Sequence, residues 1–176
     1  MLLALFTMGL TVGGLLSATV LGLLSGLATP VPLSWRYAVI VLVAVLGLLR
    51  ETGLVAIRLP QNARQIEQDV LQRNRRGVFQ FGFELGTGVR TYLSATAPYV
   101  LATALFLAGQ QLRVALLAGF GFGIGRALTP LVRRAGGDGG RWDADLRIRL
   151  RAITVGGSVV LLIALALLGI RHWVSG

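Results

Sequence analysis

Charged side chains stand within or beside strongly apolar runs of this chain, where an unpaired charge is costly. Glu51 ends one apolar run and Arg126 lies inside another. Glu84 and Arg90 stand on either side of the Gly86–Gly88 segment. Carboxylates and guanidinium groups that come together could bind an anionic or polar solute, or pair with one another and hold helices. Alternatively, each arginine could reach separately towards a polar surface, and the sequence leaves all three interpretations open.

Hydroxyl groups are the second feature with a chemical use. The letters Leu-Ser-Ala-Thr occur twice, at residues 16–19 and 93–96, each time among apolar residues. The second copy supplies Ser94 and Thr96 and is followed by Pro98, which removes a backbone hydrogen bond and would bend a helix. Such a bend would open a small polar gap and predicts a solute site. The alternative is close packing, since hydroxyls can bond back to the preceding turn and small residues let helices approach.

The composition indicates that these residues belong to a membrane protein. Of 176 residues, 55% are hydrophobic and only 14% are charged, whereas soluble domains carry about 25% charged residues. A helix needs about 20 mostly apolar residues to cross a bilayer. Five stretches are of this kind, at roughly 2–28, 37–58, 88–108, 112–132 and 150–170. We therefore predict an all-α polytopic membrane protein, a single domain over residues 1–176 with about five transmembrane helices.

The arginines predict the orientation. The net charge of +10 comes from 17 basic residues, gathered mainly in the loops 58–76 and 133–151. Because cytoplasmic loops carry an excess of basic residues, we expect a multi-pass protein of a bacterial inner membrane with its N-terminus cytoplasmic and its C-terminus external. The expected partners are the lipid bilayer, whose anionic headgroups attract these loops, and other membrane chains, but not nucleic acid.

A polar segment and a break are predicted between the second and third spans. Residues 61–85 have the pattern of an amphipathic segment that lies at the membrane interface. A helix from residue 77 to 108 would be about 48 Å long, which is too long for one straight crossing. We therefore expect the helix to break at Gly86–Gly88.

Rows of small residues predict helix contacts, because small side chains let two helix backbones approach closely. Gly9, Gly13 and Ser17 recur at intervals of four in the first span. Gly119 and Gly123 do the same in the fourth, where Gly121 and Gly125 form a second row.

The sequence contains few residues that could carry out catalysis. The chain has no cysteine and a single histidine, His172, so thiol chemistry is excluded and neither a metal nor a cofactor is expected. No span holds a pair of Asp, Glu or His residues that could act as acid and base. An intramembrane enzyme is therefore the least favoured class, and no catalytic residue is predicted.

The stretches GGLLSATVLGLLSGL and LSATAPYVLATAL resemble the CcdA/DsbD-type membrane domains, which place a small-residue motif with a proline inside a span. The resemblance implies paired repeats and, in that family, electron transfer through cysteines beside the proline. The corresponding places here are Ala18-Thr19 and Ala97-Pro98. Because no thiol stands there, the thiol-transfer function does not carry over to this chain.

The two Leu-Ser-Ala-Thr copies also predict an internal repeat. The shift that superposes them also places Arg36 on Arg113. This register suggests a duplicated two-helix unit whose copies run in the same direction, unlike the inverted repeats of the family above. The alternative is a chance match in a chain built mostly from a few residue types.

Two classes of function follow. The first is a membrane-embedded subunit or assembly partner of a larger complex, which docks through its glycine rows and charges. The second is a small oligomeric transporter of an anionic or polar solute that uses the Arg/Glu cluster. Because five spans enclose little volume, both classes imply a homo-oligomer or a complex with other membrane proteins.

Overall fold

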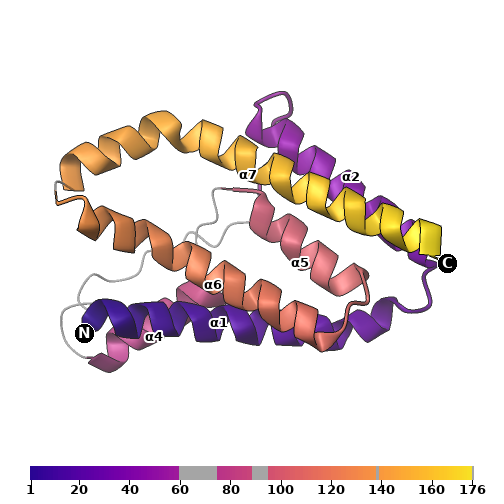
Figure 1. Cartoon of the computed structure of the whole chain (residues 1–176), viewed down its shortest axis with the longest axis horizontal. Helices are drawn as coiled ribbons and strands as arrows, with labels where there is room; N and C mark the ends of the chain where they lie inside the picture. Colours follow the sequence, from indigo (N-terminus) through magenta and orange to yellow (C-terminus); the bar gives the residue numbers. More distant parts are fainter. Residues whose placement is uncertain (60–74, 89–94, 138, 176) are drawn as a thin grey trace. The chain divides into compact units, whose positions relative to one another are not determined.

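The structure is a computed structural model that describes residues 1–59, 75–88, 95–137 and 139–175. Every regular element in these ranges is a helix (Figure 1). In chain order the elements are α1 (Leu2–Leu24), the 3-10 helix η1 (Ser25–Ala28), α2 (Leu33–Glu51), α4 (Arg75–Thr87), α5 (Ala97–Leu107), α6 (Leu112–Ala135) and α7 (Gly139–Ser175). The predicted all-α fold is confirmed.

Four of these helical segments are long and apolar enough to cross a membrane, and the protein is a polytopic helical membrane protein. The four segments are Leu2–Ala28, Leu33–Glu51, Leu112–Ala135 and Gly140–Arg171. They expose many large apolar side chains, among them Leu16, Leu42 and Leu117. In water such surfaces would be a liability, but in a bilayer they face lipid.

The third predicted span differs from the expectation. Within residues 88–108 the described helix is α5, which has 11 residues and is therefore about 16 Å long. Pro98 lies at the start of α5, where its missing N–H would have had no partner within the helix. The expected bend in mid-helix is thus replaced by a helix start.

The predicted break at Gly86–Gly88 is present in the structure. Helix α4 ends at Thr87, and Gly88 has a φ of 70°, a left-handed conformation that favours glycine. The predicted amphipathic segment 61–85 is described from Arg75 onwards, as part of α4, and its earlier residues lie outside the described ranges.

The chain divides into two compact units, and the single domain expected from the sequence stays a prediction. The first unit comprises Met1–Val20, Pro60–Leu93 and Gln111–Ala144, and the second comprises Leu21–Leu59, Ser94–Gln110 and Asp145–Gly176. Helices α1 and α7 each contribute to both units, so each unit is described separately below.

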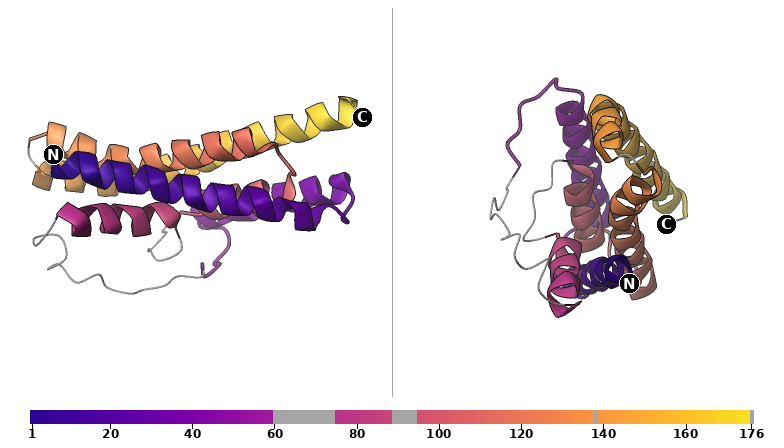
Figure 2. Two further views of the ribbon diagram at one scale, coloured as in Figure 1. Left: turned by 90° about the horizontal axis from the view of Figure 1, so that it is seen from below. Right: turned by 90° about the vertical axis from the view of Figure 1, so that its left-hand side faces the viewer.

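In the first unit, α4 lies along the N-terminal part of α1, with which it runs parallel (Figure 2). The contact is made of glycines that face the backbone of the other helix. A Cβ at Gly9 would lie 2.8 Å from the Phe83 nitrogen, and one at Gly13 would lie 2.8 Å from the Thr87 nitrogen. These distances leave no room for a side chain, so the two backbones touch.

In the second unit, α2 and α5 pack antiparallel around a core of larger side chains. This core consists of Tyr37, Ile40, Ala44, Val100, Ala104 and Leu165. Ile40 is fully buried, and Gly169 of α7 lies against the ring of Tyr37. The second unit is therefore held by interlocking side chains from α2, α5 and α7.

Candidate functional site

The N-terminus of α5 and the C-terminus of α2 form a buried polar site in the second unit. The backbone nitrogen of Thr96 donates a hydrogen bond of 2.8 Å to Glu51 Oε1. The same oxygen lies 3.1 Å from Arg50 Nη1. The side chain of Glu51 is only 8% exposed, so its charge is held by these two groups rather than by water.

The local sequence explains why the two helices end here. Thr96 precedes Ala97 and Pro98, and a proline in the first turn is already set for a helix start. The α2 helix ends at Glu51, and Gly53 follows with a φ of 77°, which turns the chain away. The Thr96 hydroxyl also donates a bond of 3.3 Å to the Gly47 carbonyl.

The electrostatics of this site favour the α5 helix. The first N–H groups of a helix have no partner within the helix, and its N-terminus carries a partial positive charge. The Glu51 carboxylate accepts one of the N–H groups at this end and supplies the opposite charge. Arg50 balances the carboxylate and also donates through Nε to the Ile57 carbonyl at 2.9 Å.

The other end of α5 is also held by a charged residue of α2. Arg36 donates through Nη1 to the Leu107 carbonyl at 3.3 Å, and Gln110 donates to the Tyr37 hydroxyl at 3.2 Å. Cations are favourable at the C-terminus of a helix. Helix α2 thus places an anion at the positive end of α5 and a cation at its negative end.

Arg36 and Tyr37 were not predicted from the sequence as site residues. The available signal was a charged residue at the start of an apolar run, with a second charge, Glu51, at its end. Two opposite charges separated by the length of a helix could have suggested a partner helix with its dipole reversed.

The other candidate charges lie in the first unit. Arg126 of α6 has its guanidinium carbon 5.6 Å from the centre of the Phe122 ring, a cation–π contact. Glu84 of α4 accepts a hydrogen bond of 3.2 Å from Gln80. Glu51 belongs to the second unit, so the cluster expected from the sequence stays a prediction. Arg90 and Ser94 lie outside the described residues.

The residues predicted to pack helices all lie at contacts within the first unit. Gly9 and Gly13 face α4, and the Ser17 hydroxyl donates to the Thr87 carbonyl at 2.9 Å. A Cβ at Gly119 would meet the Ala18 side chain, and one at Gly123 would lie 2.6 Å from the Thr11 Cα. Helix α1 therefore contacts α4 through one row of small residues and α6 through another.

The arrangement offers structural rather than catalytic chemistry. The buried carboxylate of Glu51 is already bonded to a backbone N–H and a guanidinium group. In the described ranges, no three His, Cys, Asp or Glu residues come together in a way that could hold a metal ion. The geometry at α5 is that of a helix held at both ends.

Comparison of the chain with protein-family models, with curated proteins and with solved structures finds no match. The resemblance to CcdA/DsbD-type domains and the internal duplication therefore stay predictions. In this structure the two Leu-Ser-Ala-Thr copies have different surroundings, since Thr19 lies within α1 and the equivalent Thr96 precedes α5.

Proposed function

We propose that this protein is a membrane-embedded subunit or assembly partner of a larger complex in a bacterial inner membrane. The observation that carries the proposal is the presence of two glycine rows on α6. Gly119 and Gly123 are covered by α1, whereas a Cβ added at Gly121 or Gly125 would meet no described atom within 4 Å.

An open glycine row in an apolar helix is useful mainly for contact with another helix. Glycine is a poor helix former, by about 1 kcal/mol relative to alanine, so it is not favoured by local structure. In a bilayer, helices associate through close packing, and the spacing of Gly121 and Gly125 is that of a common helix-pairing motif. Leu117 and Leu128, one turn before Gly121 and one turn after Gly125, are 71% and 53% exposed, which adds apolar side chains to the same helix face.

The test is to fill the open row and, separately, the covered row. Gly121→Leu with Gly125→Leu should release the partner or the second copy and leave thermal stability unchanged. Gly119→Leu with Gly123→Leu should unfold the first unit. The pair Gly156→Leu and Gly157→Leu on α7 is the matched control, since these glycines also meet nothing within 4 Å.

Purification in mild detergent, with mass spectrometry and size-exclusion chromatography, gives the readout. The proposal predicts a smaller complex for the first variant alone. If the Gly121/Gly125 variant keeps the same mass and the same partners as the wild type, the open row is not a docking surface.

One observation favours the second candidate, a small oligomeric transporter. Helix α5 is too short to cross a bilayer by itself, and short helices with a polar N-terminus line solute sites in many transporters. In this alternative an anionic or polar solute would compete with Glu51 for the N-terminus of α5. Solute uptake by protein-containing liposomes, with a lower KM for the solute in Glu51→Gln because the competing charge is gone, would favour transport, while a helix-holding role predicts no uptake for either protein.

The topology is part of the proposal. We place the N-terminus and the basic loops in the cytoplasm and the C-terminus outside, on the strength of the arginine distribution. Because the chain has no cysteine, single cysteines can be labelled cleanly. An impermeant thiol reagent should label Gly176→Cys in intact cells and should spare Gly137→Cys, and the reverse pattern would overturn this orientation.

A further inference from the structure

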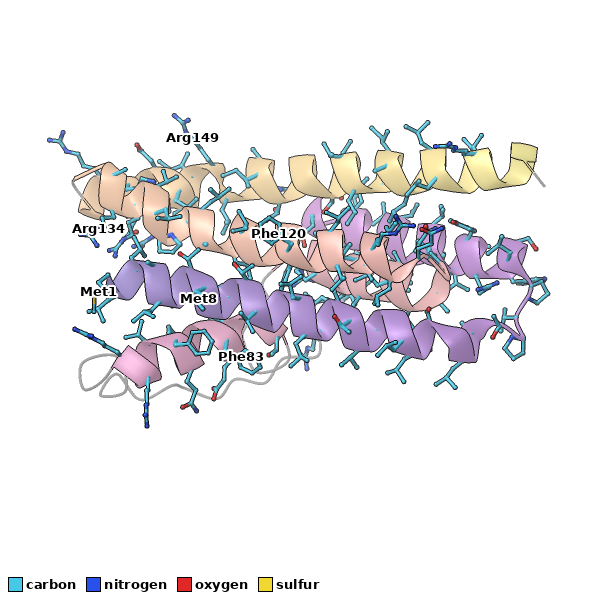
Figure 3. The ribbon with its side chains drawn as sticks, turned by 60° about the horizontal axis from the view of Figure 1, so that its bottom comes forward. Met1, Met8, Phe83, Phe120, Arg134 and Arg149 are labelled. Carbon is cyan, nitrogen blue, oxygen red and sulfur yellow. The ribbon has the colours of Figure 1, made fainter. Side chains whose placement is uncertain are left out.

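A cavity of about 390 Å³, largely open to the surroundings, lies in the first unit, where the first turns of α1 and α4 meet, and it is lined by Met1, Leu5, Arg75, Arg76 and Phe79. Its volume is in the range of small-molecule sites. Residues four apart share a helix face, so Met1 and Leu5 form one wall, and Arg75 and Phe79 form the other. Figure 3 shows Met1 at this end of α1, with the start of α4 beside it.

One part of this cavity is strongly positive. Arg75 and Arg76 are exposed, and no acidic residue stands in the first turn of α1 or of α4. Because the two helices run parallel, their N-termini lie at the same end, and each adds a partial positive charge. Within the described part of the unit, Asp143 is held by Arg133 through two bonds of 2.9 Å, and Glu84 lies in the C-terminal half of α4, where it accepts a bond from Gln80. The described groups around this cavity therefore favour an anion here.

The rest of the cavity is apolar. Leu5 and Phe79 are partly buried and present hydrocarbon beside the two guanidinium groups. A small inorganic ion would use the arginines and leave this apolar wall empty. A ligand with an anionic group attached to an alkyl chain would use both parts.

The position along the helices agrees with a ligand of this kind. The apolar span of α1 begins at Leu2, so its first turn lies where the hydrocarbon core of the bilayer gives way to the headgroups. Phosphate groups of lipids lie at that level, and their acyl chains extend along the span.

We propose that the cavity formed by Met1, Leu5, Arg75, Arg76 and Phe79 binds an anionic phospholipid. Arg75 and Arg76 hold the headgroup phosphate, and Leu5 and Phe79 cover the first carbons of an acyl chain. The cavity does not involve Gly121 or Gly125 of α6. The lipid proposal can therefore be tested independently of the proposed function.

The test is native mass spectrometry of the whole protein in mild detergent, titrated with phosphatidylglycerol and with phosphatidylcholine of the same chains. Phosphatidylglycerol should bind in preference. The double variant Arg75→Gln/Arg76→Gln should lose about thirty-fold in affinity for it, given the attraction of each arginine to anionic lipid. The control, Arg147→Gln/Arg149→Gln, removes two exposed charges from α7 and should change the affinity less than about two-fold.

Three outcomes would overturn the proposal. Equal losses in the two double variants would mean diffuse attraction by the net charge, and equal binding of the two lipids would mean that no anion site exists. Full competition by inorganic phosphate would mean a phosphate site without a chain. Should Arg75→Gln/Arg76→Gln fold poorly, Arg75→Lys/Arg76→Lys keeps both charges, and its affinity should stay within about three-fold of the wild type.

Discussion

Helices α1 and α4 meet through glycines and backbone atoms, whereas α2 and α5 meet through larger side chains and two charged ends. Gly82 and Gly86 of α4 face the carbonyl groups of Phe6 and Leu10 in the first contact. In the second contact the one close glycine, Gly47, faces the side chains of Thr96 and Val100. The first helix pair is thus held by backbone contact at glycines, and the second is held by contact between side chains.

Both kinds of contact are suited to a lipid environment. Lipid chains are as apolar as leucine, so burying apolar surface between two helices in a bilayer contributes little to their association. The α1 and α4 helices gain from close backbone contact, in which Cα–H groups can approach carbonyl oxygens. The α2 and α5 helices gain from shape-matched side chains and from the groups that Glu51 and Arg36 satisfy.

The largest effect is expected from Gly86→Ala, which would separate the α1 and α4 backbones. Its Cβ would lie 2.8 Å from the Leu10 carbonyl carbon and closer still to the oxygen. Since a backbone cannot move aside as a side chain can, we expect a loss of about 3 kcal/mol in unfolding free energy. Unfolding by dodecyl sulfate in mixed micelles gives this value.

Gly47→Ala is the matched control in the second contact. Its Cβ would lie 3.1 Å from the Thr96 hydroxyl oxygen, which belongs to a side chain that can shift, so the loss should stay below about 1 kcal/mol. Equal losses for Gly47→Ala and Gly86→Ala would remove the distinction between the two contacts.

Ile40→Ala should have the next largest effect. Ile40 is fully buried in the α2·α5 core, and its truncation leaves a cavity. In soluble cores this change costs about 2–5 kcal/mol, but the transfer part is small in a bilayer, so we expect about 2 kcal/mol. Ile40→Val should cost clearly less in the same assay. A loss below that of the lipid-facing control Leu42→Ala would mean that side-chain packing does not hold this contact.

Glu51→Ala should cost about 1.5 kcal/mol, because hydrogen bonds to charged groups contribute this order of free energy. Glu51→Gln keeps an acceptor for the Thr96 N–H and should lose less. Hydrogen exchange at the first amides of α5 is the decisive measurement, since Glu51→Ala should raise exchange there and leave the centre of α1 unchanged. Unaltered protection at α5 would show that the carboxylate does not hold this helix end.

Ser17→Ala is expected to have the smallest effect. Its hydroxyl makes a side-chain hydrogen bond across the α1·α4 contact, to the Thr87 carbonyl at 2.9 Å. Such bonds between membrane helices contribute about 0.6 kcal/mol on average. Thr19→Ala is the control, because the Thr19 hydroxyl bonds to Leu15 in its own helix and should matter less. A Ser17→Ala loss as large as that of Gly86→Ala would mean that polar bonding, not backbone approach, dominates this contact.

Much of the fold follows from local sequence. The apolar runs determined that the chain forms membrane helices, because a run of about 20 apolar residues has no stable alternative inside a bilayer. The start of α5 beside Pro98 and the break at Gly88 reflect the backbone limits of proline and glycine. Proline alone, however, did not distinguish a bent helix from a helix start, since it is compatible with both.

The partners of the polar residues were decided only by the tertiary structure. Leu-Ser-Ala-Thr reads the same at 16–19 and 93–96, yet Thr19 bonds to Leu15 in its own helix, whereas the equivalent Thr96 meets Glu51 and Gly47 of another helix. Which groups meet depends on which helix lies alongside and in which direction it runs. That choice arises from contacts between residues far apart in the chain, and composition and spacing do not encode it locally.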